Sequence, residues 1–66
     1  MIGTRVIAYV ASRPPIKPTE DPGFIDFVYP NGAMRIVFDD GRSVTGYPDG
    51  RIPLWGRNAY WVEEAS

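Results

Sequence analysis

The chain has 66 residues, a formal net charge of −1 and a hydrophobic content of 44%. It contains neither Cys nor His, which excludes disulfides, zinc sites of the usual kind and imidazole catalysis. A domain this small buries only about 60% of its unfolded surface, so its core must pack well or its copies must associate. The near-neutral charge also argues against a generic nucleic-acid binder, which normally carries a basic excess.

The sequence shows no feature of a membrane or secreted protein. No apolar run approaches the roughly 20 residues of a membrane span. The first residues, 1–5, lack the charged head and the apolar stretch of a signal peptide. Because Cys is also absent, we expect a cytoplasmic (intracellular) protein with no membrane partner.

The N-terminal third predicts one strand and one stiff connection. Residues 4–11 are rich in β-branched and aromatic side chains, which favour a strand. Residues 12–23 carry four prolines, which lack backbone donors and resist both helix and central strand. We expect an extended, polyproline-like connection that acts as a linker, as a ligand within the same chain or as a partner-binding element.

A nine-residue repeat runs through the chain from the end of this connection. Glycines recur at positions 23, 32, 41 and 50, and each of the last three follows an Asn or an Asp. Asn-Gly and Asp-Gly are typical of two-residue type I′ hairpin turns, because both central residues of such turns need positive φ. The repeat therefore predicts three successive hairpins in a meander over residues 24–55, with turns at 31–32, 40–41 and 49–50.

Two-residue turns also fix which residues face one another. In this register Phe27 faces Ile36, Ile36 faces Thr45, and the apolar side chains gather on one side of the sheet. A slip by one residue would move them to the other side. Gly46, in mid-strand, indicates a bend or a bulge. The predicted core face contains Ile25, Phe27, Tyr29, Met34, Ile36, Phe38, Tyr47, Ile52 and Leu54.

The C-terminal segment predicts the last strand, over residues 59–63. We expect Tyr60 or Trp61 to pair with Leu54 or Trp55, in a register that the sequence leaves open. No segment shows the 3.6-residue period of a helix. The chain therefore predicts a single all-β domain over residues 1–66, an antiparallel meander of five or six strands. Because a meander has two free edges, we expect it to curl into an SH3-like or small open barrel.

The sequence lacks the common patterns of catalysis and metal binding. Without His or Cys, no usual nucleophile–base set can be assembled, and the glycine spacing matches neither phosphate-loop fingerprint. Asp39 and Asp40 are typical turn residues, and Glu63 and Glu64 lie in a solvated tail. We expect a non-enzymatic protein that binds no cofactor and no metal.

Arginines and large aromatic residues are the candidate contacts with a partner, because they anchor many protein interfaces. The same aromatics are also needed in so small a core, and arginines that flank turns keep hairpin edges charged. On a small barrel, an aromatic and cationic surface can also bind single-stranded nucleic acid by stacking and phosphate contact. The residues that could form such a surface are Arg35, Arg42, Arg51, Arg57, Tyr60 and Trp61. The candidate protein-binding residues are Arg35, Arg51, Trp55, Arg57, Tyr60 and Trp61.

Residues 28–52, VYPNGAMRIVFDDGRSVTGYPDGRI, place aromatic residues before Asn-Gly and Asp-Gly turns at a short regular spacing. This segment resembles the G-box repeats at the C-terminus of T-complex-10-like centriolar scaffold proteins. The resemblance implies an antiparallel sheet that binds a proline-rich peptide. This chain differs in ending its repeats after three or four units, and its own Pro-rich stretch could occupy the peptide site in cis.

The sequence as a whole favours a non-enzymatic protein-binding module, whose partner is another protein or a proline-rich peptide. A compact product of this kind fits a small inhibitor or accessory factor, for instance from a phage or mobile element. The first alternative is a nucleic-acid-binding small β-barrel, for which steep salt dependence is the discriminator. The second is a structural β protein whose sheets join edge to edge into a homo-oligomer.

Overall fold

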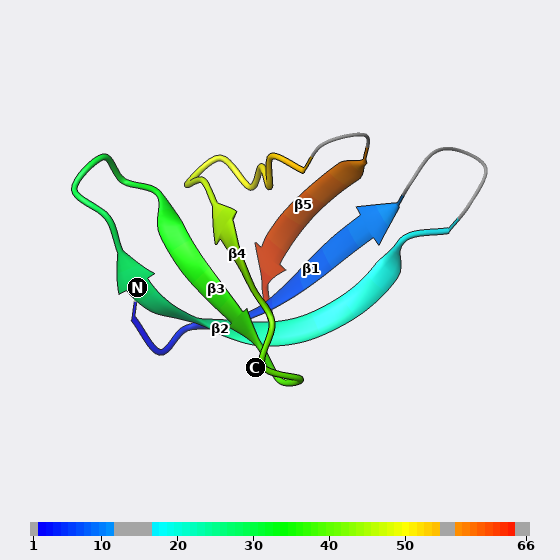
Figure 1. Cartoon of the computed structure of the whole chain (residues 1–66), viewed down its shortest axis with the longest axis horizontal. Coiled ribbons are helices and arrows are strands. Elements are labelled where there is room, and N and C mark those ends of the chain that lie inside the picture. Colours follow the sequence, from blue (N-terminus) through cyan, green and yellow to red (C-terminus); the bar gives the residue numbers. More distant parts are fainter. Residues whose placement is uncertain (1, 12–16, 55–56, 65–66) are drawn as a thin grey trace.

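The computed structural model describes residues 2–11, 17–54 and 57–64. These residues form one antiparallel sheet of five strands in the order β4-β3-β2-β1-β5. The sheet curls into a half-barrel whose two halves share the long, bent strand β2 (Figure 1). This confirms the predicted all-β fold of five strands in a small open barrel. The strands are β1 (Arg5–Ala11), β2 (Thr19–Val28), β3 (Met34–Phe38), β4 (Ser43–Gly46) and β5 (Asn58–Glu63).

β2 begins inside the segment that the prolines predicted to be a connection. Residues 19–23 pair with β1, and Pro22 faces Ile7. The carbonyl oxygen of Pro22 accepts a hydrogen bond from Asp39 N–H at 3.1 Å, so its nitrogen also points toward the end of β3. The missing donor of Pro22 therefore costs no hydrogen bond to β1. The remainder of the predicted connection includes residues 12–16, which lie outside the described residues.

The three hairpin turns share one geometry, which differs from the predicted one. In the first turn, Gly32 N–H donates to Tyr29 O at 2.9 Å, and Tyr29 N–H donates to Ala33 O at 2.8 Å. The same pair of bonds recurs around Gly41 and Gly50. Among the described residues only glycines have positive φ. The type I′ prediction is therefore wrong: each loop has three residues, a type I turn followed by a left-handed glycine.

A side-chain oxygen adds one further hydrogen bond to each turn. An oxygen of Asn31, Asp40 or Asp49 accepts the backbone N–H two residues further on, in each case at 3.0 Å. The two aspartates also hold the arginine that follows, because Arg42 Nε donates to Asp40 at 2.7 Å and Arg51 Nε donates to Asp49 at 3.0 Å. These acids therefore serve the local geometry of the turns.

The longer loops move each hairpin register by one residue. Ile36 faces Ile25, and the predicted contact between Phe27 and Ile36 is wrong. The longer loop alone places Phe27 opposite Arg35, and a β-bulge at Asp26 then shifts the register again, so that Ile25 lies opposite Ile36. Since a bulge changes the phase of the alternation, Phe27 points to the outer face, where it is 43% exposed.

The concave face of the half-barrel holds the core. Five of the nine predicted core residues are buried there, and Leu54 packs against them. The two predicted tyrosines are half-buried and Phe27 is exposed. Strand β1 adds Val6 and Ala8, which are fully buried and lie outside the hairpin repeat. The buried apolar residues are Val6, Ala8, Ala11, Ile25, Ala33, Met34, Ile36, Phe38 and Ile52.

β5 extends the sheet by pairing with β1 along its length, and among the described residues its backbone meets the third hairpin only at residues 50–52. The ladder between β1 and β5 contains six residue pairs. On its other side β5 meets the third hairpin in one isolated bridge, between Arg51 and Tyr60. The predicted pairing of Leu54 with Tyr60 or Trp61 is therefore wrong, and Trp55 lies outside the described residues.

Trp61 and Gly46 hold the contact between β5 and the third hairpin together. The indole Nε1–H of Trp61 donates to the carbonyl oxygen of Tyr47 at 2.9 Å. A Cβ added at Gly46 would lie 2.9 Å from the Trp61 ring and from Ile36 Cδ1. Gly46 therefore makes room for the indole at the end of β4, and the bulge lies instead at Asp26.

Candidate protein-binding groove

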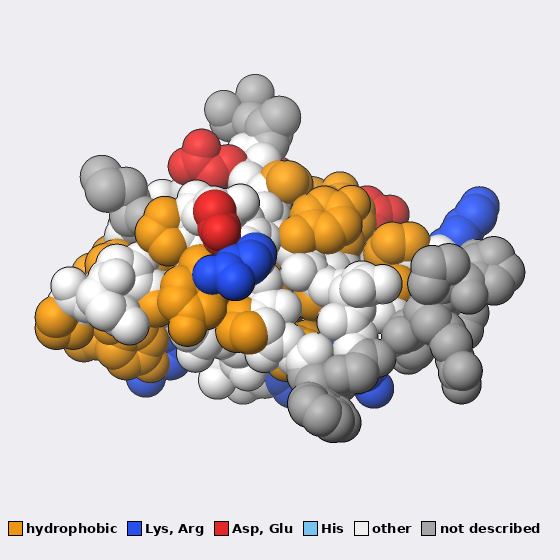
Figure 2. All heavy atoms as spheres, turned by 90° about the horizontal axis from the view of Figure 1, so that it is seen from above, with side chains coloured by type: hydrophobic (Ala, Val, Ile, Leu, Met, Phe, Trp, Pro, Cys, Tyr) orange, Lys and Arg blue, Asp and Glu red, His pale blue; other side chains and the backbone are white. Residues whose placement is uncertain are grey.

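Arg35 lies on the outer face of β3 and is already paired. Its Nε and Nη2 donate to the two carboxylate oxygens of Asp26 at 2.7 and 3.0 Å. Its guanidinium carbon lies 5.7 Å from the centre of the Phe27 ring. The hydrogen bond from the Arg35 side chain lowers the pKa of Asp26. Hydrophobic side chains are exposed at the end of the molecule that carries the β2–β3 turn, at left in Figure 2.

Arg51 and Tyr60 are neighbours across the bridge that joins the third hairpin to β5. Arg51 is held by Asp49, and its guanidinium carbon lies 5.1 Å from the centre of the Tyr47 ring. Tyr60 stacks on Tyr9 of β1, with ring centres 5.0 Å apart and planes inclined by 21°. Two of the predicted contact residues therefore come together on the outer surface.

The other predicted contact residues are separated from this pair. Trp61 packs against the core, on the face of β5 opposite to Tyr60. Arg35 lies on β3, near the opposite edge of the sheet. Trp55 lies outside the described residues. Arg57 lies apart from all of these, at the edge of a cavity.

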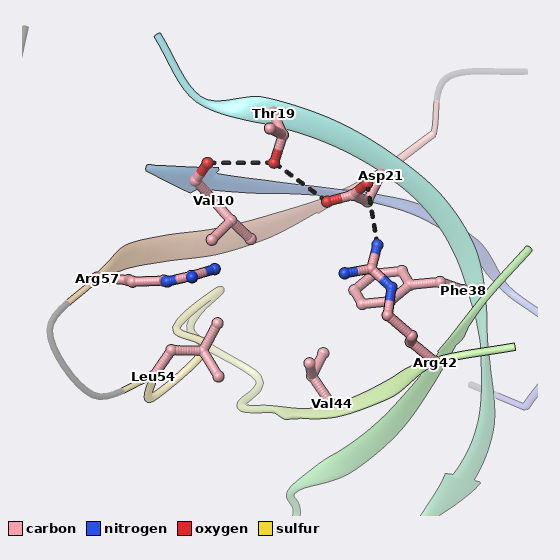
Figure 3. A pocket seen from close by; sticks show the side chains of 8 residues that line it. All are labelled: Val10, Thr19, Asp21, Phe38, Arg42, Val44, Leu54 and Arg57. Carbon is pink, nitrogen blue, oxygen red and sulfur yellow. Dashed lines mark hydrogen bonds and ion pairs between the residues drawn. The ribbon is translucent and has the colours of Figure 1, made fainter. Parts of the chain in front are cut away.

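This cavity is a groove of about 210 Å³ at the open side of the half-barrel. Its walls come from the end of β1, the start of β2, the β3–β4 hairpin and the residues that precede β5 (Figure 3). The curl of the sheet brings these segments together. The groove is lined by Val10, Thr19, Asp21, Phe38, Arg42, Val44, Leu54 and Arg57.

The polar residues of the groove are partly satisfied by one another. Thr19 Oγ lies 3.2 Å from the carbonyl oxygen of Val10 and 3.2 Å from Asp21 Oδ2. Arg42 reaches Asp21 at 3.5 Å and Asp40 at 2.7 Å. The hydrogen bond from the backbone N–H of Arg42, followed by that from its side chain, lowers the pKa of Asp40. Arg42 is therefore positioned by two acids, and its guanidinium carbon also lies 5.5 Å from the centre of the Phe38 ring.

Arg57 differs from the other described arginines. Arg5, Arg35, Arg42 and Arg51 each form an ion pair, whereas Arg57 forms none with any acidic side chain of the described residues. Figure 3 shows its guanidinium and that of Arg42 pointing into the groove from opposite sides. Two arginines against one aspartate give the lining a net charge of +1 (2 − 1).

Among the groove residues, the sequence identified Arg57 as a candidate protein contact, and Arg42 only as part of the alternative nucleic-acid surface. The other lining residues belong to segments far apart in the chain, and no local pattern connects them. Arg42 and Arg51 each pair with the Asp two residues before them, and Arg57 has no acid at that position. That no acid from a distant segment of the described residues reaches Arg57 follows only from the fold.

Comparisons with known proteins add no assignment. No protein-family model matches the chain, and no curated protein and no solved structure matches it. Within residues 2–11, 17–54 and 57–64, no group of three or more His, Cys, Asp or Glu side chains is arranged to hold a metal ion. The same part of the chain has no helix long and apolar enough to cross a membrane. The groove is thus the feature from which a function can be argued.

Proposed function

We propose that the chain is a non-enzymatic protein-binding module that takes an acidic segment of a partner protein into the groove. The observation that carries the proposal is Arg57, a guanidinium without an acidic partner among the described residues, at the edge of an apolar cavity. Burial of apolar surface supplies affinity, and a small number of placed polar groups supplies orientation. A small inhibitor or accessory factor is the role that fits such a module.

The size of the groove favours a side chain of a larger ligand. Pockets for small molecules usually measure about 300–1,000 Å³, and this groove measures about 210 Å³. It therefore suits one apolar side chain of a partner and not a whole metabolite. Val10, Val44 and Leu54 offer that side chain an apolar contact surface.

The charge of the groove favours a carboxylate next to that side chain. Arginine presents a planar fork of donors that matches the two oxygens of a carboxylate. Arg42 already shares its donors between Asp21 and Asp40, so Arg57 is the group with donors to offer. A partner segment with an apolar residue beside an Asp, a Glu or a C-terminal carboxylate satisfies both parts of the groove.

The free edge of β4 offers backbone hydrogen-bonding groups to such a segment. β4 is an end strand of the sheet, and its Val44 lines the groove. Phe38 N–H donates to Arg42 O at 2.7 Å, and bonds alternate along an antiparallel ladder. Ser43 and Thr45 therefore direct their backbone N–H and C=O groups away from β3. An extended segment can add to β4 through these groups, which is a recurring mode of peptide recognition.

A selection from a random peptide display library tests this function. We expect the enriched peptides to carry an acidic residue next to an aliphatic or aromatic one. Arg57→Gln should weaken their binding by about tenfold or more, since hydrogen bonds to charged groups are worth about 1.5–3 kcal/mol. Arg35→Gln is the matched control, because it makes the same change outside the groove and should leave the affinity unchanged.

A backbone variant tests the second part of the proposal. Thr45→Pro removes an N–H that points away from β3, so it should weaken peptide binding while the β3–β4 ladder survives. Thr45→Val is its control. Peptide binding that is indifferent to both Arg57→Gln and Thr45→Pro would contradict the function. Selective, salt-sensitive binding of an oligonucleotide at the groove would favour the nucleic-acid alternative.

A further inference from the structure

The outer face of β5, β1 and β2 carries an apolar patch that is separate from the groove. Tyr60 and Val62 are 47% and 42% exposed on β5. The register places Tyr9 beside Tyr60 and Ile7 beside Val62. The third strand continues the patch, because Pro22 faces Ile7. We define the outer patch as Ile7, Tyr9, Pro22, Phe24, Tyr60 and Val62.

Charges of opposite sign lie on either side of this patch. The row through the two tyrosines runs Arg51–Tyr60–Tyr9–Glu20 across four neighbouring segments. Directly paired residues share one face of a sheet, so all four side chains lie on the outer face. The row therefore begins with a cation and ends with an anion.

A second row of opposite charges lies at the other end of the patch, with the signs reversed. Glu64 N–H donates to Arg5 O at 3.0 Å, which continues the ladder between β1 and β5 by one pair. Arg5 Nε lies 3.6 Å from a carboxylate oxygen of Glu64. The anion is on the β5 side of this row and the cation on the β1 side.

We propose that the outer patch is the interface of a homodimer, in which a second copy packs face to face about a two-fold axis. The axis lies in the interface, parallel to the strands, between β1 and β5. Rotation about it exchanges the β1 side with the β5 side. Each copy then places Tyr60 on the partner's Tyr9 and Val62 on the partner's Ile7. This is an isologous contact between aligned sheets.

The same rotation matches every charged position named above with its opposite. Arg51 of one copy meets the partner's Glu20, and Arg5 meets the partner's Glu64. Arg51 and Arg5 already have acidic neighbours in their own chain, so these contacts set orientation more than affinity. This self-complementarity of charge is what favours a second copy of the chain over an unrelated partner.

The size of the outer patch sets the strength of the dimer. Neighbouring strands lie about 4.8 Å apart and residues rise about 3.4 Å along a strand, so the two rows enclose roughly 14 Å by 14 Å. That is about 200 Å² on each copy, well below the roughly 800 Å² per partner of a standard specific interface. We therefore expect a weak, reversible dimer with a dissociation constant on the order of 0.1–1 mM.

Sedimentation equilibrium of the full chain over a wide concentration range is the test. The wild type should pass from monomer to dimer and form nothing larger. Glu20→Arg alone sets Arg51 against an arginine of the partner, and Arg51→Glu alone sets two glutamates together. Each single variant should dimerise at least about tenfold more weakly, because like charges are placed opposite one another.

A mixture of the two variants shows whether each single variant dimerises weakly because a contact is repulsive or because the chain no longer folds. The Glu20→Arg chain carries two cations in the row and the Arg51→Glu chain carries two anions, so a mixed dimer regains both attractive contacts. We expect the mixture to associate as tightly as the wild type. A wild type that stays monomeric at about 1 mM, or a mixture no tighter than either variant alone, would overturn the proposal.

Discussion

The two halves of the sheet that share β2 are held together in different ways. In the half formed by β2, β3 and β4, the shortest ion pairs are local: Arg42 binds Asp40 two residues away, and Arg35 binds Asp26 nine residues away. In the half formed by β1 and β5, the ladder joins residues far apart in the chain, such as Ala8 and Trp61. Turn chemistry thus builds the first half, whereas packing between the two ends of the chain builds the second.

Removing the aromatic residue that joins the halves should have the largest effect. Trp61→Ala removes packing against the core and the hydrogen bond to Tyr47 O. Truncating a large core aromatic costs about 3–5 kcal/mol, and a chain of this length has about 3–10 kcal/mol of stability in total. We expect a largely unfolded variant in chemical denaturation monitored by far-UV circular dichroism. Tyr60→Ala, on the exposed face of the same strand, is the control and should stay folded.

Filling the space below the indole should have the next largest effect. Gly46→Ala places a Cβ 2.9 Å from the Trp61 ring and from Ile36 Cδ1, so the side chains must shift. Overpacking of this kind costs about 1–3 kcal/mol. The denaturation midpoint should fall, and the fluorescence of Trp61 should change in the native state. A midpoint equal to that of the wild type would mean that Gly46 does not limit the contact between β5 and the third hairpin.

A substitution in one turn should destabilise the fold less, because the other two turns keep their own hydrogen bonds. Asp49→Ala removes the acceptor of Arg51 N–H and should cost about 0.5–1.5 kcal/mol, the usual worth of one hydrogen bond. Asp49→Asn keeps an oxygen in the same place, as Asn31 does in the first turn, and should cost less. If Asp49→Ala proved as harmful as Trp61→Ala, the contrast between the two halves would be wrong.

Lowering the pH should have the smallest effect on stability, and mainly on the half formed by β2, β3 and β4. The ordinary carboxyl pKa is 3.8, and Asp26 and Asp40 lie below it because Arg35 and Arg42 hydrogen-bond to their charged forms. A lowered folded-state pKa gives stability that is complete above the unfolded pKa and is lost as pH falls through the folded one. The melting temperature should therefore stay level down to about pH 5 and decline below about pH 4. The double variant Asp26→Asn, Asp40→Asn should show a shallower decline.

The same contrast explains what the sequence could and could not predict. The glycine period located all three hairpins and most of the core, because turn signals act locally. The predicted length of two residues for each loop was wrong, although Pro30 and Pro48 favour a type I turn with glycine in its last position. The bulge at Asp26 and the pairing of β5 with β1 leave no local pattern. The groove and the outer patch were missed because both draw residues from β1 and the start of β2.

The most direct test of the proposed function is to map a selected acidic peptide on the protein by NMR chemical shifts. We predict that the methyl groups of Val10, Val44 and Leu54 and the side chain of Arg57 shift most, with a smaller response in Arg57→Gln. The tyrosines of the outer patch should keep their shifts. Shifts confined to the outer patch, or unchanged by Arg57→Gln, would contradict the account of the groove.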